Sequence, residues 1–271
     1  VQRLECKRYL ERWEVTVVAT LIRSRWTSSF EGMSRHDRQG CEYDAYLPDP
    51  LTGWELALPA DLAADLSDAE AAIRRLNATG TSHVSLEGLA RFLLRAESVA
   101  SSKIEGLEAG PRRLLDAEVV LAQGGDAADR IAVEVLANVA AMEAAVELGS
   151  STDTITLDDL LGIHRTLMER SSMPHIGGVV RTMQNWIGGS SYNPCSAVFV
   201  PPPPDTVDAL LHDLLDYVNG DDHPALVQAA IAHAQFETIH PFADGNGRTG
   251  RALIHVILRR RGLAPRFVPP I

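Results

Sequence analysis

Apolar residues recur every three to four positions over most of this chain, which is the spacing of helices that bury one face. Glycine, proline and short polar stretches interrupt these runs and mark where one helix ends and the next begins. The pattern predicts helices near residues 60–79, 85–105, 111–122, 127–148, 157–169, 206–218, 224–238 and 248–261. Because helical spacing dominates, we expect an all-α fold, built as a helical bundle.

The pattern changes between residues 177 and 200, where glycines break the chain repeatedly and short apolar runs lie between them. Such a pattern predicts a small β-hairpin rather than a helix. The centre of this hairpin would be formed by Trp186, Ile187, Gly188 and Gly189. Its edge could pair with a strand of another protein or could be merely structural, and the residues alone leave both readings open.

The breaks suggest three parts of the chain. Residues 1–40 form an N-terminal extension of uncertain order, residues 41–149 an N-terminal helical region, and residues 150–271 the remaining core. The clearest boundary is the small, polar segment Gly149–Ser151. Met33 is a candidate natural start, which would make residues 1–32 an upstream extension.

Composition limits the classes of partner. A net charge of −11 and a pI near 5.3 oppose a broad nucleic-acid-binding face. With 45% hydrophobic residues the chain can bury a sizeable core. The apolar run from Val15 to Ile22 is shorter than the roughly 20 residues of a membrane helix, and no signal-peptide pattern follows it. We therefore expect neither a nucleic acid nor a membrane as partner.

Three cysteines, Cys6, Cys41 and Cys195, are odd in number and show no C-x-x-C spacing. This pattern indicates neither a disulfide framework nor a zinc site. A reducing cytoplasm is the compartment that fits it best.

The segment from His240 to Arg251 concentrates the candidate chemistry. It leads into the last predicted helix, whose first amides lie near Gly245 and Gly247 and have no partner within the helix, so they favour a bound anion. Arg248 and Arg251 are cations near a helix N-terminus and oppose its macrodipole. They therefore indicate an anionic ligand or a carboxylate partner.

Two further side chains complete this segment. Asp244 is a hard oxygen ligand that suits Mg²⁺ shared with substrate phosphates. His240, with an ordinary pKa of about 6.5, can accept a hydroxyl proton at neutral pH. The segment thus predicts a nucleoside polyphosphate beside a base. The glycines also match G-x-G-x-x-G, but a dinucleotide-binding motif must follow a strand, and here helical spacing precedes it. A Walker A loop is excluded because no Lys-Ser or Lys-Thr follows the glycines.

The same segment resembles the H-x-F-x-[DE]-G-N-G-R-x-x-R signature of Fic domains, and weaker similarity extends over roughly residues 55–271. The resemblance implies a Fic-type helical bundle that transfers AMP from ATP to a Ser, Thr or Tyr hydroxyl of a target protein. It further implies a role for each motif residue: His240 as base, Phe242 as the anchor of the loop in the core, Asp244 on Mg²⁺, Asn246 with the amides around Gly245 and Gly247 on the phosphates, and Arg248 and Arg251 on the β- and γ-phosphates.

A second motif lies at Ser101, Glu105 and Gly106, where the serine and the glutamate are one helical turn apart. It resembles the [ST]-x-x-x-E-[GN] inhibitory helix of Fic proteins that carry their inhibitor on the N-terminal side. The resemblance implies that Glu105 pairs with Arg251 and takes the guanidinium that the γ-phosphate needs.

The resemblance also implies that the predicted hairpin is a flap that docks the target. The expected partners are ATP, a hydroxyl-bearing target protein and the protein itself, with a homodimer left open. Removal of AMP, phosphate transfer and phosphocholine transfer are alternative activities at the same site. From a different class, the chain could be a nucleotide-sensing interaction protein without turnover.

Overall fold

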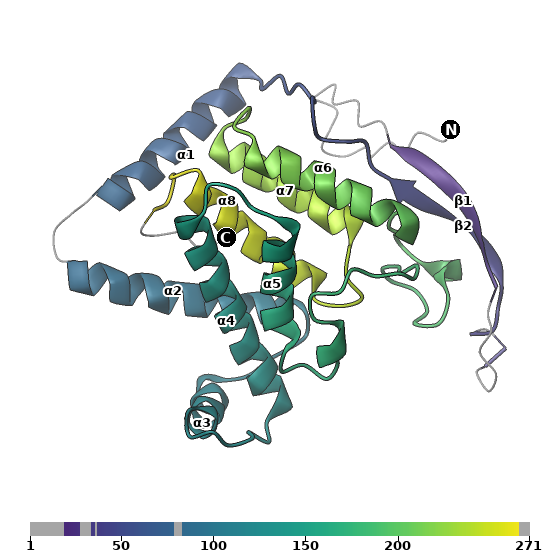
Figure 1. Cartoon of the computed structure of the whole chain (residues 1–271), viewed down its shortest axis with the longest axis horizontal. Helices are drawn as coiled ribbons and strands as arrows, with labels where there is room; N and C mark the ends of the chain where they lie inside the picture. The colour runs from purple at the N-terminus through teal and green to yellow at the C-terminus, as the bar shows by residue number, and fades with distance from the viewer. Residues whose placement is uncertain (1–18, 28–33, 36, 79–82, 266–271) are drawn as a thin grey trace.

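The computed structural model describes residues 19–27, 34–35, 37–78 and 83–265 of the chain (Figure 1). Its helices are α1 (Ala60–Ala78), α2 (His83–Ile104), α3 (Pro111–Ala122), α4 (Arg130–Ser151), α5 (Leu157–Met168), α6 (Val207–Asn219), α7 (Ala225–Ile239) and α8 (Asn246–Arg260). Within these ranges, none of the helices is long and apolar enough to span a membrane. The predicted mostly helical fold is confirmed.

Every predicted helix is present, and each observed end lies within three residues of the expected one. The largest difference is at α4, which begins at Arg130 because the side chain of Asp129 accepts a hydrogen bond from the amide of Ala132 and caps the helix. The boundary predicted near Gly149 falls in the last turn of the same helix.

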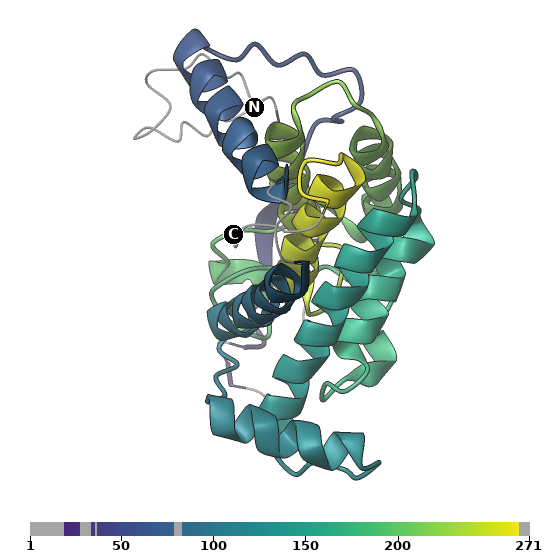
Figure 2. The same cartoon turned by 90° about the vertical axis from the view of Figure 1, so that its left-hand side faces the viewer.

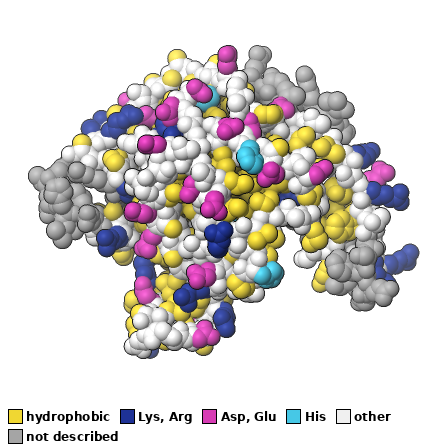
Figure 3. Space-filling view, in the orientation of Figure 1, with side chains coloured by type: hydrophobic (Ala, Val, Ile, Leu, Met, Phe, Trp, Pro, Cys, Tyr) yellow, Lys and Arg dark blue, Asp and Glu magenta, His cyan; other side chains and the backbone are white. Residues whose placement is uncertain are grey.

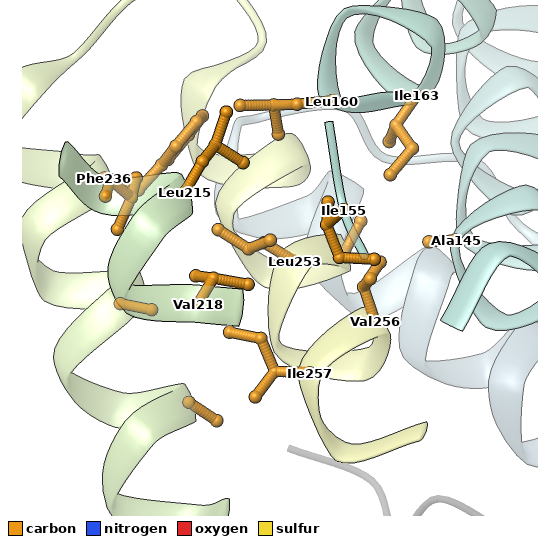
Figure 4. Packing of buried hydrophobic residues seen from close by; sticks show 14 of the residues in the cluster. Ala145, Ile155, Leu160, Ile163, Leu215, Val218, Phe236, Leu253, Val256 and Ile257 are labelled. Atoms are coloured by element: carbon orange, nitrogen blue, oxygen red, sulfur yellow. The ribbon is translucent and has the colours of Figure 1, made fainter. Parts of the chain in front are cut away.

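Helix α8 lies at the centre of the hydrophobic core and packs against α4, α5 and α7. Its Leu253, Val256 and Ile257 are fully or almost fully buried, and burial of one such side chain contributes about 1.5–3 kcal/mol. Figure 4 shows them among side chains from neighbouring helices, including Ala145, Val218 and Phe236. This packing fixes the position of the first turn of α8, where the motif residues lie.

Helix α2 crosses α4 and packs against it, and the C-terminal half of α2 reaches α8 (Figures 1 and 2). A buried polar contact holds it there, because the side-chain amide of Asn138 on α4 donates to Ser98 O at 2.8 Å and to Ser102 Oγ at 3.0 Å. Such a buried network specifies one docking position for α2. Helix α3 covers the N-terminal half of α4 through a smaller apolar cluster that includes Leu114 and Val133.

The regular sheet is an antiparallel ribbon of β1 (Thr20–Trp26) and β2 (Cys41–Leu47), in a register that opposes Thr20 to Leu47. The sequence did not predict it, and it brings part of the N-terminal extension into the described fold. A disulfide joins Cys41 in β2 to Cys195. The expectation of no disulfide was therefore wrong, because the two cysteines are 154 residues apart and only the fold brings them together. The cysteines consequently give no support for a reducing compartment.

The predicted hairpin between residues 177 and 200 is present only as one antiparallel bridge, which joins Ile187 to Phe199. The amides of Val198 and Phe199 both donate to Ile187 O, so two residues oppose one, as in a β-bulge. The rest of this region is irregular and includes the 3₁₀ turn Pro194–Ser196. We refer to residues 186–200 as the flap.

The surface agrees with the acidic composition. On the face shown in Figure 3, Asp and Glu side chains are spread over the helical part, with Lys and Arg between them. On this face the distribution is typical of a solvated helical surface.

Candidate active site

The motif residues occupy the turn between α7 and α8, which we call the catalytic loop (residues 240–245). His240 ends α7 in the left-handed conformation, with φ 49° and ψ 60°, and its amide donates to Phe236 O at 2.9 Å. It is the one non-glycine residue with positive φ in the described parts of the chain. Gly245, with φ 81°, then forms the N-cap of α8. The N-terminus of α8 lies where the sequence predicted an anion site.

The side chain of Asn246 holds this loop in shape. Its Oδ1 accepts from Phe242 N at 2.8 Å, and its Nδ2 donates to Phe242 O at 2.9 Å. The side-chain oxygen and one of the two side-chain N–H groups are thus used inside the loop, and the main-chain amide of Asn246 is a further donor at the start of α8. The predicted anchoring of the loop by Phe242 is confirmed, since this ring is completely buried.

His164 on α5 is a further support of the loop, and the sequence analysis gave it no role. Its ring stacks on Phe242, with centroids 3.7 Å apart. Its Nδ1 accepts from Gly178 N, so the proton is on Nε2, which donates to Asp244 O at 2.9 Å. Burial lowers the pKa of His164 to about 4, so the ring is neutral at pH 7. No spacing in the sequence connects α5 with a loop 80 residues away.

The imidazole of His240 lies largely buried beside the N-terminus of α8. Burial lowers its pKa, and the nearby guanidinium of Arg181 lowers the pKa further. The ring is therefore neutral at pH 7 and can accept a proton. Its Nδ1 is buried and has no hydrogen-bond partner in the described part of the protein.

Arg248 presents unpaired donors at the same place. Its side chain is only 3% exposed, its Nη2 lies 3.8 Å from Asp244 Oδ1, and within the described residues its buried Nε and Nη1 have no acceptor. Buried donors without a partner cost about 1–3 kcal/mol each, so this guanidinium is arranged for an acceptor that a ligand would bring.

Arg251 is paired as the inhibitory motif predicted. Its Nη2 contacts Glu105 Oε1 at 2.7 Å, and its Nε donates to Ser101 Oγ at 2.7 Å. A Cβ added at Gly247 would lie 2.2 Å from Glu105 Oε1, so the carboxylate rests directly against the first turn of α8. Gly106, with φ 80°, then turns the chain away from α2. The predicted pairing of Glu105 with Arg251 is confirmed.

A metal would be held through Asp244. This side chain is half-exposed, and its Oδ1 accepts from Gly245 N at 2.6 Å. Over the described ranges, no three His, Cys, Asp or Glu side chains lie together in a way that could bind a metal ion. Mg²⁺ is commonly bound by one or two carboxylates together with substrate phosphates. A lone carboxylate beside an anion site fits a Mg²⁺ that binds with a nucleotide.

The flap residues predicted to dock a target lie together near this loop. Trp186 donates from Nε1 to Ser190 O at 2.6 Å, and Ile187 forms the bridge to Phe199. Gly188 and Gly189 both have positive φ, and a Cβ at Gly189 would lie 2.4 Å from Ser196 O, so the tight turn of the flap requires glycine there.

The ribbon packs behind the flap. Tyr46 N in β2 donates to Val200 O at 2.9 Å, and the rings of Trp26 and Trp186 meet edge to face with centroids 5.2 Å apart. Together with the disulfide of Cys195, these contacts attach the flap to the ribbon.

Comparisons with known proteins agree with this site. The Fic/DOC family model matches residues 154–258, and the Fic/DOC family N-terminal model matches residues 63–147. Protein adenylyltransferase fic-1 of Caenorhabditis elegans is 34% identical over 125 residues, which are 45% of this chain and 23% of that protein. Protein adenylyltransferase Fic of Aedes aegypti is 37% identical over 122 residues, 44% of this chain and 22% of that protein. The matched part thus spans less than a quarter of these relatives.

Solved structures show the same fold. A Fic family protein from Desulfovibrio desulfuricans G20 superposes with a TM-score of 0.59 at 28% identity, covering 78% of this chain and 61% of that one. Fic-1 from C. elegans superposes with a TM-score of 0.57 at 25% identity, with the same coverage of 78% and 61%. The two family models together include both the loop from His240 to Gly245 and the helix end that carries Glu105, and the chain belongs to the Fic/DOC family.

Proposed function

We propose that this protein transfers AMP from ATP to a hydroxyl group of a target protein. The observation that carries the proposal is the neutral imidazole of His240 next to the N-terminus of α8, where Arg248 and Arg251 supply positive charge. The names of the relatives, protein adenylyltransferases, support the same reaction.

In this reaction His240 accepts the proton of the attacking hydroxyl. The hydroxyl oxygen forms a bond to the α-phosphorus, the bond from that phosphorus to the bridging oxygen breaks, and pyrophosphate leaves. A positioned base contributes about 10²–10⁴ in rate. The first amides of α8 and the two arginines stabilise the phosphate charge, and such transfer depends mainly on position and charge. Mg²⁺, bound through Asp244, would neutralise part of the phosphate charge.

We further propose that the protein is autoinhibited by Glu105. Its carboxylate contacts both the guanidinium of Arg251 and the first turn of α8 near Gly247, so it would exclude a phosphate from the same donors. A preference of about 2.7 kcal/mol for this closed arrangement is enough to keep roughly 99% of the molecules inactive.

The experiment is intact-mass analysis of the wild type and of Glu105→Gly after incubation with ATP and Mg²⁺. A gain of AMP that is much faster in Glu105→Gly supports both transfer and autoinhibition, and equal labelling removes Glu105 from the inhibitory role. A gain of phosphate alone indicates a kinase, and no gain indicates a nucleotide-sensing binder. The control is Glu105→Gly/His240→Ala, which should bind a fluorescent ATP analogue normally and gain almost no AMP.

A further inference from the structure

The left-handed backbone of His240 needs an explanation, because a non-glycine residue with positive φ persists only where its surroundings determine it. The conformation matters for function, since it sets the direction in which the imidazole leaves the end of α7. Two side chains from the segment before the flap bond to the carbonyl of this residue. They are Arg181 and Asn185.

Arg181 connects the end of α7 with both sides of the flap. Its Nε donates to His240 O at 2.8 Å, and its Nη2 donates to Pro202 O at 2.7 Å and to Ile239 O at 3.2 Å. Its Nη1 donates to Met183 O at 3.2 Å, and its own amide donates to Pro241 O at 2.9 Å. The side chain is 6% exposed, so these carbonyls replace water as its partners.

Asn185 makes a second connection of the same kind without a charge. Its Nδ2 donates to His240 O at 3.2 Å and to Phe242 O at 3.1 Å. The carbonyl of His240 therefore receives donors from two residues that lead into the flap. If both were removed, this peptide group would lose the partners that oppose its return to an ordinary conformation.

The charge of Arg181 is placed where a cation is favoured. The last carbonyls of α7 carry the negative end of the helix dipole, and a guanidinium there is stabilised. Burial lowers the pKa of Arg181 to about 10, so the group is still charged at pH 7. The charged groups that face His240 are Arg181, Glu105 at the end of α2 and Asp244 in the loop, and the nearby main chain of Glu237 raises the pKa of the ring.

We propose that Arg181 and Asn185 are positioning residues, which hold His240 in its left-handed conformation. They thereby keep its imidazole at a fixed position relative to the flap that receives the target. The proposal rests on the proposed AMP transfer for its effect on rate. Its structural part, the conformation of His240, is independent of that function.

The test uses the full chain carrying Glu105→Gly as the reference protein. Arg181→Lys, Asn185→Ala and the combination are added to it, and the rate of AMP gain is measured at saturating ATP. Each change should lower this rate by about tenfold or more, because misplacement of a reacting group by about 1 Å costs on the order of 10²-fold. Binding of a fluorescent ATP analogue should stay near the reference value. The combination should lose less than the product of the single losses, because both side chains hold the same carbonyl.

Gln184→Ala is the matched control. Its Nε2 donates to Asn185 O and Pro201 O, at 3.0 and 2.9 Å, so it lies beside the two positioning residues but has no hydrogen bond to the catalytic loop. Its rate should remain close to that of the reference protein. A loss as large as that of Arg181→Lys would mean that any damage to this segment lowers the rate, and would overturn the proposal.

The pH profile separates a positioning role from general damage. Arg181→Gln removes a positive charge beside His240 and should move the acid limb of the rate profile to higher pH. Asn185→Ala should lower the rate without moving this limb. A profile lowered equally at all pH values in both variants would contradict the assignment of Arg181.

A second measurement is independent of activity. Carbon chemical shifts of isotope-labelled histidine, with the His240 signal identified by its loss in His240→Gln, report positive φ directly. They should change in Arg181→Lys and Asn185→Ala and stay unchanged in Gln184→Ala. Should Arg181→Lys fail to fold, as shown by its melting curve, the half-buried Asn185 decides the question. Unchanged shifts and rates in Asn185→Ala would refute the proposal, whereas a reference protein that gains no AMP would refute only the proposed function.

Discussion

A second contact between α2 and α8 is expected to decide how firmly Glu105 is held. Glu97 Oε1 lies 2.7 Å from His255 Nε2, and these side chains are 8% and 0% exposed. Glu97 lies on α2 about two turns before Glu105, which directly follows the helix, and His255 and Arg251 lie one turn apart on α8. The contact at Glu97 therefore aligns the whole end of α2 on α8. We predict that Glu97→Leu releases the inhibitory helix.

The size of the effect follows from burial. A buried hydrogen bond to a charged group contributes about 1.5–3 kcal/mol, whereas the partly exposed pair of Glu105 and Arg251 contributes about 0–1 kcal/mol. Loss of the buried contact should change the ratio of closed to open molecules by about 10- to 150-fold. Starting from roughly 1% open, this raises the open fraction to between about 10% and 60%.

The assay is the rate of AMP gain by intact mass. Glu97→Leu should label itself faster than the wild type, whereas Glu97→Leu/Glu105→Gly should be no faster than Glu105→Gly alone, since both changes open the same site. Glu118→Gln is the control, because it breaks the bond of α2 to α3 through Arg95 and leaves α8 untouched. Wild-type labelling in Glu97→Leu, or further activation in the double variant, would refute the reasoning.

Three more outcomes are expected. Burial raises the pKa of Glu237 from 4.5 to about 7, so the folded protein holds this proton more tightly and loses stability, on the order of 3 kcal/mol in total, as the pH rises from 4.5 to about 7. Urea unfolding should therefore show a larger loss between pH 5 and pH 8 in the wild type than in Glu237→Gln, and equal losses would contradict this reading. Breaking the Cys41–Cys195 disulfide should lower the free energy of unfolding by about 2–4 kcal/mol, so a reductant should lower the melting temperature of the wild type and leave that of Cys41→Ser unchanged. In Gly247→Ala the new methyl group should displace Glu105 and also fill the anion site. Binding of a nucleotide analogue should therefore fall, and the variant should gain no AMP. Activation like that of Glu105→Gly would show that the anion site still has room for the phosphate.

Much of the helical fold could be predicted from the sequence, because helix signals are local. The end of α2 at Ile104 follows from Gly106, and the start of α8 at Asn246 follows from the glycines around it. The loop motif likewise lies in consecutive residues, so His240 and Asp244 could be assigned their places before the fold was known.

Most features that depend on pairing between distant segments could not be predicted from the residues, and the pairing of Glu105 with Arg251 was expected only from the resemblance. β1 and β2 are separated by residues 27–40, and the sequence of neither strand indicates which segment it pairs with. The same is true of the disulfide, of His164 under the catalytic loop, and of Glu97 against His255, which is 158 residues away. The role of Arg181 could not be predicted either, because its partners are main-chain carbonyls, which every residue type carries.

The left-handed turn at His240 also affects how substitutions at this position change stability and activity. Glycine or asparagine would adopt this backbone more readily than histidine, so either could relax the turn while it removed the imidazole. A screen that selects only for heat resistance would thus favour inactive sequences at this position. Stability and turnover compete at one residue, and a thermostable version of the chain has to be sought elsewhere in the molecule.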